Sequence, residues 1–153
     1  MSPATPVTEP AAWSRWSRLM IWMLALFVLG ATAVIALGGW LIVNDESDHT
    51  DDWDGFGTWI GILLAGFAAL VAVVSAALLG AVVHAHRRAR DRGDTHRLRG
   101  AAGAVTVAAG LWLVFGLAGI SVMSGSISMW NLLAVPAVPL LAASLGVFRT
   151  TDA

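Results

Sequence analysis

The feature that most constrains the fold of this chain is the confinement of its charged residues to a few short blocks. Between these blocks lie four uncharged apolar segments, at residues 19–43, 59–83, 101–123 and 127–148. Each is long enough, at roughly 20 helical residues, to cross the hydrocarbon core of a bilayer. Charged residues make up 12% of the chain, about half of the roughly 25% found in soluble domains. The pattern predicts an all-α, polytopic membrane protein with four transmembrane helices in two hairpins.

The segments outside this predicted transmembrane domain, residues 19–148, are short. Residues 1–18 begin with MSPATPVTEP, which has no apolar face to bury, and we expect disorder there. In the same segment, Trp13 and Trp16 alternate with Arg15 and Arg18, a composition that suits the headgroup layer. Residues 149–153 form a brief tail. A secretory signal peptide is the alternative for the first span. The apolar run of this span, however, exceeds the ~7–15 residues of the apolar region of a signal peptide.

The arginines predict the orientation of the spans. All nine basic residues are Arg: Arg15 and Arg18 precede the first span, six lie between residues 84 and 99, and Arg149 follows the fourth span. The loop at residues 44–58 carries six acidic residues and no basic one. With four crossings, every arginine falls on one side. The positive-inside rule therefore predicts that both termini and the central basic segment are cytoplasmic, in a multi-pass cell-membrane protein.

The residue types that are absent narrow the chemistry. The chain has no cysteine, which excludes disulfides and thiolate chemistry, and its lack of lysine is typical of a GC-rich, bacterial genome. No nucleotide-binding, metalloprotease or nucleophile motif is present, and no ionisable residue lies well within a span. We expect no enzyme activity, no cofactor, no metal and no nucleic-acid partner.

The central basic segment is expected to bind anionic lipid at the cytoplasmic face, since each arginine near such a surface contributes ~1 kcal/mol. The predicted lipid contacts are Arg87, Arg88, Arg90, Arg92, Arg97 and Arg99. The alternative is a metal or phosphate site that uses the three histidines between residues 84 and 99. His84 and His86, two residues apart on a helix, would point to different sides, which disfavours it.

The loop at residues 44–58 offers a second alternative, a divalent cation bound by its carboxylates. An EF-hand alignment on Gly55 places Thr50 first and Gly61 last, so the bidentate glutamate is missing. A solvated acidic loop is favoured.

Two features of the spans predict helix contacts. Small residues recur on one face of the second span, which favours close packing against another helix: Gly61, Ala65, Ala69, Ala72, Ala76 and Gly80. In the fourth span, Pro136 and Pro139 are expected to kink the helix and to free the carbonyls of Leu132 and Val135. Trp112, which falls level with the kink in an antiparallel hairpin, is a candidate donor to one of these carbonyls; packing against lipid or the first span is the alternative.

The function expected from these features is non-catalytic. The chain is predicted to be an accessory or interaction subunit of a larger membrane complex, or a homo-oligomer, with lipid and another membrane protein or itself as partners. A small oligomeric channel or transporter, with its path near the Pro136 and Pro139 kink, is the alternative. The uniformly apolar spans favour the first interpretation.

Overall fold

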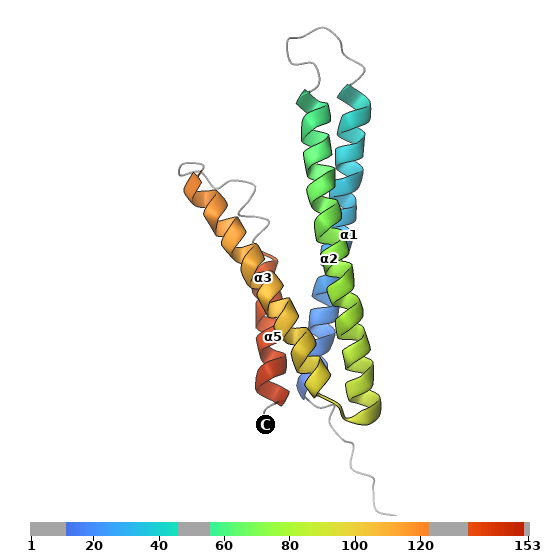
Figure 1. Cartoon of the computed structure of the whole chain (residues 1–153), viewed down its shortest axis with the longest axis vertical. Helices are drawn as coiled ribbons and strands as arrows, with labels where there is room; N and C mark the ends of the chain where they lie inside the picture. The colour runs from blue at the N-terminus through green and yellow to red at the C-terminus, as the bar shows by residue number, and fades with distance from the viewer. Residues whose placement is uncertain (1–11, 46–55, 123–134, 152–153) are drawn as a thin grey trace, which may run out of the picture. The chain divides into compact units, whose positions relative to one another are not determined.

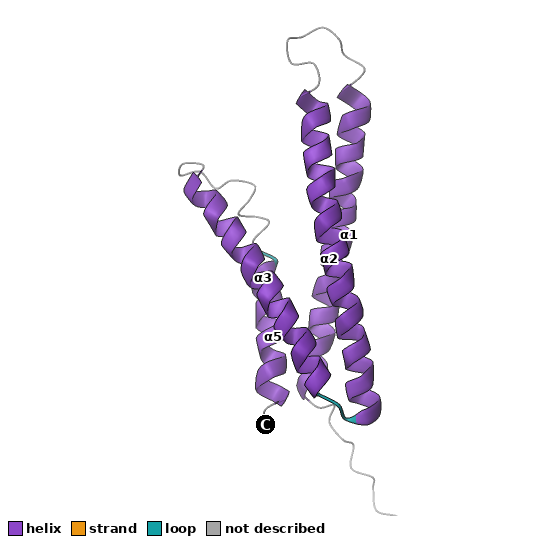
Figure 2. Ribbon diagram, in the orientation of Figure 1, coloured by secondary structure: helices purple, strands orange, loops and turns teal. Residues whose placement is uncertain are grey.

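The computed structural model describes residues 12–45, 56–122 and 135–151, and these residues are almost entirely helical (Figures 1 and 2). The helices are α1 (Ala12–Asp45), α2 (Phe56–Arg92), α3 (His96–Val122) and α5 (Ala137–Thr151). No strand occurs within these three ranges. The predicted all-α class is therefore confirmed.

The basic segment is helical for most of its length. α2 continues through Arg92, and only residues 93–95 separate it from α3. Gly93 ends α2 with a positive φ of 69°, and its N–H donates to the Ala89 carbonyl at 3.0 Å, as is usual for a glycine after the last helical turn. The Thr95 carbonyl then accepts the Arg99 N–H at 3.0 Å. The central basic segment is thus the end of one helix, a tight connection and the start of the next helix, and both helices carry arginines.

The chain divides into two compact units that do not coincide with the two predicted hairpins. Unit 1 comprises residues 1–21 and 82–153, and unit 2 comprises residues 22–81. Both α1 and α2 contribute to each unit, whereas α3 and α5 belong to unit 1 alone.

In unit 2, small residues let α1 and α2 approach each other closely. The residues buried along the two helices recur at every seventh position, and within this unit they are Leu24, Ala31, Gly38, Gly61, Ala68 and Ser75. Such a repeat is the signature of a left-handed helix pair. At the narrowest point, a Cβ on Gly38 would lie 2.7 Å from the Gly61 carbonyl oxygen, and one on Gly61 would lie 2.6 Å from that of Gly38. Only glycine fits at either position.

Many large apolar side chains of α1 and α2 point outward. Leu29 is 70% exposed, Val43 is 72% exposed and Trp59 is 68% exposed. In the most apolar windows of the helical segments Ala12–Asn44 and Gly57–Arg92, only 17% and 11% of residues are buried. Both segments are long and apolar enough to cross a membrane. A core helix of a soluble protein would instead bury most of such a window.

In unit 1, α3 and α5 pack along each other, joined by a polar contact (Figure 1). Thr106 on α3 donates from Oγ1 to Oγ of Ser144 on α5 at 2.9 Å, and Ser144 is fully buried. Close by, Gly103 lies where an added Cβ would meet Phe148 at 3.6 Å. Gly146 faces the indole of Trp16 on α1 so closely that an added Cβ would fall 2.7 Å from Cε3. Trp16 therefore packs directly on the backbone of α5.

The two prolines mark the start of α5. Val135 and Pro136 form a turn, α5 begins at Ala137, and Pro139 falls in its first turn. The first helical turn tolerates proline because its N–H groups have no partner within the helix. The predicted kink also involves residues 127–134, which lie outside the described residues, so it stays a prediction.

Candidate functional site

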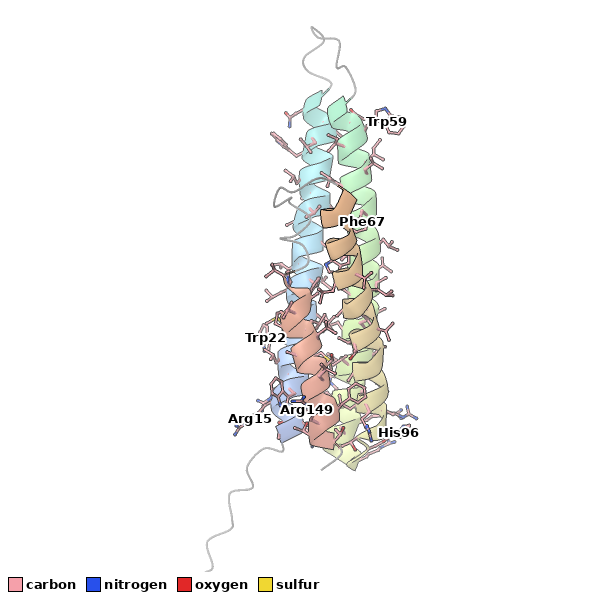
Figure 3. All side chains as sticks on the ribbon, turned by 90° about the vertical axis from the view of Figure 1, so that its left-hand side faces the viewer. Arg15, Trp22, Trp59, Phe67, His96 and Arg149 are labelled. Atoms are coloured by element: carbon pink, nitrogen blue, oxygen red, sulfur yellow. The ribbon has the colours of Figure 1, made fainter. Side chains whose placement is uncertain are left out.

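All nine arginines of the chain fall within unit 1. Figure 3 shows Arg15 of α1, His96 of α3 and Arg149 of α5 at the same end of this unit. This end, made by the start of α1, the end of α2, the start of α3 and the end of α5, is called the basic end below. It is the densest group of like charges in the described chain and the candidate functional site.

A buried hydroxyl joins α1 and α2 at the basic end. Ser17 is fully buried, and its Oγ lies 2.8 Å from Nδ1 of His86. The same hydroxyl lies 3.2 Å from the Ser14 carbonyl, to which it can donate. Trp13 covers the imidazole from the side, with ring centroids 5.7 Å apart and planes inclined by 64°. His86 is thus held by two residues of α1.

The surroundings of His86 disfavour its protonated form. Its pKa lies below the ordinary value of 6.5, first because the ring is partly buried and then because Arg18 and Arg90 repel a positive charge there. The two guanidinium groups come from different helices. Positive groups from both α1 and α2 therefore act on the imidazole.

The arginines differ in how they are held. Arg18 is fixed along α1, because its Nε donates to the Ser14 carbonyl at 3.1 Å and its Nη2 to Ser14 Oγ at 3.3 Å. Arg97 forms a salt bridge with Asp94, with Nε 3.6 Å from Oδ2. Both side chains of that pair are well exposed, so the pair contributes little stability.

The six arginines predicted to contact lipid divide between two helices. Arg87, Arg88, Arg90 and Arg92 lie on the last turns of α2, and Arg97 and Arg99 on the first turns of α3. Four of the six are exposed, and Arg88 and Arg99 are half-buried. Their contact with anionic lipid stays a prediction.

The small-residue stripe predicted on the second span follows the buried face of α2 only at its start. Gly61 is buried against α1, and Ala65 and Ala72 are half-buried. Ala69, Ala76 and Gly80 are exposed, because steps of three and four residues leave the seven-residue repeat along which α1 and α2 pack. The contact between α1 and α2 therefore uses Ala68 and Ser75 instead.

The predicted contact between Trp112 and the proline segment is only partly described. Pro139 cannot donate to the Val135 carbonyl, but the Val138 N–H does so at 3.3 Å. This carbonyl therefore has a partner, contrary to the sequence-based expectation that it would be free. Leu132 lies outside the described residues, and Trp112 is half-buried on α3. Donation by the Trp112 indole stays a prediction.

Metal binding was the alternative for the histidines and for the acidic loop. Across the described ranges no group of three His, Asp or Glu side chains could hold a metal ion. The acidic block at residues 46–55 lies outside those ranges, so its expected solvation stays a prediction.

Comparison with protein-family models, curated proteins and solved structures finds no match for this chain.

Sequence patterns did not indicate the pairing of Ser17 with His86. The two residues are 69 positions apart, and serine next to a span is common. A usable signal exists, however: Ser17, Leu24, Ala31 and Gly38 lie seven residues apart, as do Gly61, Ala68, Ser75 and Val82. Because His86 lies one turn beyond Val82, this repeat places it on the face of α2 that meets α1.

Proposed function

We propose that this chain is a multi-pass membrane protein that works through helix contacts rather than catalysis, as an accessory subunit of a membrane complex or as a homo-oligomer. The observation that carries the proposal is the arrangement of α1 and α2, with small residues between the helices and large apolar residues outside. An exposed apolar surface of this extent calls for lipid or a partner protein. In a bilayer, close approach through small residues is how helices gain packing energy.

The proposed topology has four membrane-spanning helices with both termini in the cytoplasm. The grouping of Arg15, His96 and Arg149 at the basic end supports it (Figure 3), because arginines stay on the cytoplasmic side. The uncharged part of α2 ends near Val83, so the helical turns that carry Arg87 to Arg92 extend beyond the hydrocarbon.

Topology reporters test the membrane arrangement. A reporter that is active only outside the cytoplasm should be active when fused after Asp52 and silent when fused after Asp94. The opposite result would reverse the orientation, and activity at neither site would remove the membrane proposal altogether.

Crosslinking tests the interaction role, and the lack of native cysteine makes it clean. A photoreactive label on a cysteine introduced at Leu63 or Leu70, which are 68% and 62% exposed, should capture a second polypeptide in native membranes. The matched control is a cysteine at Ala68, which is buried on the same helix and should capture only α1 of its own chain. Lipid adducts alone from every exposed position would contradict an interaction role.

A further inference from the structure

At the basic end, neither Arg18 nor Arg90 forms a salt bridge with an acidic residue of the described chain, where Asp94 pairs with Arg97. Arg18 follows Ser17, whose Oγ lies 2.8 Å from Nδ1 of His86. Arg90 lies about one helical turn after His86 on α2. Both guanidinium groups also repel a positive charge on His86. Two guanidinium groups and an imidazole, from two helices, therefore lie near one another.

The hydrogen bonds around His86 involve only one ring nitrogen. If the Ser17 hydroxyl donates to the Ser14 carbonyl at 3.2 Å, its oxygen can accept from Nδ1–H of His86 at 2.8 Å. When the ring takes up a second proton, Nε2–H can donate to an outside acceptor. An anion beside the ring would oppose the repulsion from the two arginines and favour this protonated form.

Arg18 is already positioned for such an acceptor. Its two bonds to Ser14 order the side chain before any ligand arrives, and a guanidinium has five N–H donors in a planar fork. The remaining donors match the oxygens of a phosphate group. Little side-chain entropy is then lost on binding, which distinguishes this site from a row of mobile surface arginines.

We propose that Arg18, Arg90 and His86 form a specific site for the phosphate group of an anionic phospholipid, between α1 and α2 at the basic end. The assignment rests on the membrane location proposed above. Trp13, which packs on His86, and Trp16 belong to the residue type that anchors at headgroup depth. The phosphate layer of the cytoplasmic leaflet is therefore the source of phosphate that this site meets.

The test uses the full chain in neutral detergent micelles with dioctanoyl phosphatidic acid as the probe. Binding is followed by calorimetry and by the imidazole NMR signal of His86, one of four histidines in the chain. Phosphatidic acid should bind saturably and raise the pKa of His86. Dioctanoyl phosphatidylcholine, and inorganic phosphate at the same concentration, should do neither. An equal response to inorganic phosphate would overturn the assignment to lipid.

Charge-matched variants separate a specific site from a diffuse surface. R18Q/R90Q should weaken phosphatidic acid binding roughly thirtyfold and abolish the rise in the His86 pKa. R97Q/R149Q removes the same charge from the same end and should change binding less than threefold, since Arg97 already faces Asp94. Equal losses in the two variants would overturn the site. The wild-type titration of His86 needs no variant, so the proposal remains testable even if R18Q/R90Q does not fold.

Failure of this inference is distinguishable from failure of the proposed function. Wild-type protein reconstituted with vesicles should float with them and resist alkaline extraction. If the wild-type protein neither floats with the vesicles nor resists alkaline extraction, both the membrane proposal and this site are refuted. Stable insertion without preference for phosphatidic acid would overturn the site alone.

Discussion

Replacing Gly38 or Gly61 by alanine should push α1 and α2 apart. The new Cβ would lie 2.7 or 2.6 Å from a backbone carbonyl oxygen of the facing helix, well inside the 3.4 Å at which ordinary contact begins. A backbone atom cannot rotate away, so the helices must separate by roughly 0.5–1 Å, which forfeits a quarter to half of the attraction of the contacts they lose. Overpacking of this kind costs about 1–3 kcal/mol.

The controls for this prediction are Gly39 and Gly66, which lie on the same helices with nothing within 4 Å of an added Cβ. Alanine is the better helix former by about 1 kcal/mol, so G39A and G66A should be neutral or stabilising. This gain is common to all four variants, and the difference between each variant and its control isolates the strain.

Reversible unfolding in mixed micelles, followed by circular dichroism, measures these differences. The double variant G38A/G61A should cost less than the sum of the single variants, because the first substitution already separates the helices. If G38A is as stable as G39A, the close approach of the two helices is refuted.

Three further predictions concern unit 1. G146A should destabilise it by about 1–3 kcal/mol, measured by the same unfolding assay, because an added Cβ would overlap the Trp16 ring. T106V should cost about 1 kcal/mol, and this cost should shrink in an S144A background that has already lost the shared hydrogen bond. In an uncharged detergent, the midpoint of the unfolding transition should fall as the pH is lowered from 7.5 to 5.5. The pKa of His86 lies below its unfolded value of 6.5, so the unfolded state takes up the proton first and the stability present above pH 6.5 is lost. H86N should remove this dependence.

The helices of this chain follow from its sequence because runs such as 19–43 contain nothing that ends a helix. Their ends are harder to predict. The rule that charge ends a membrane span gives Val83 for the second span, yet α2 continues to Arg92. Arginine and alanine are strong helix formers, and nothing interrupts the helix before Gly93. The charge pattern marks where the apolar run ends, whereas the helix continues until a residue favours a turn.

Which small residues pack is not evident from composition, because alanine and glycine are spread around α2. A stripe with steps of three and four residues and the repeat of seven both begin at Gly61, and they diverge by Ala68 and Ala69. The choice between them depends on how two helices coil around each other, which requires both helices to be considered together. On α1 the matching repeat contains Ala31 and Gly38, and the two patterns in combination identify the contact face.

Considering α1 and α2 together also explains why polar groups can be buried at the basic end. A serine between two apolar helices needs a partner, and Ser17 has two, the Ser14 carbonyl and His86. Farther along the pair, the buried positions described within unit 2 are occupied by leucine, alanine and glycine, with Ser75 as the one serine. The contact between α1 and α2 therefore includes a hydrogen-bonded histidine where the arginines gather, whereas at Gly38 and Gly61 backbone carbonyl oxygens are the nearest atoms of the facing helix.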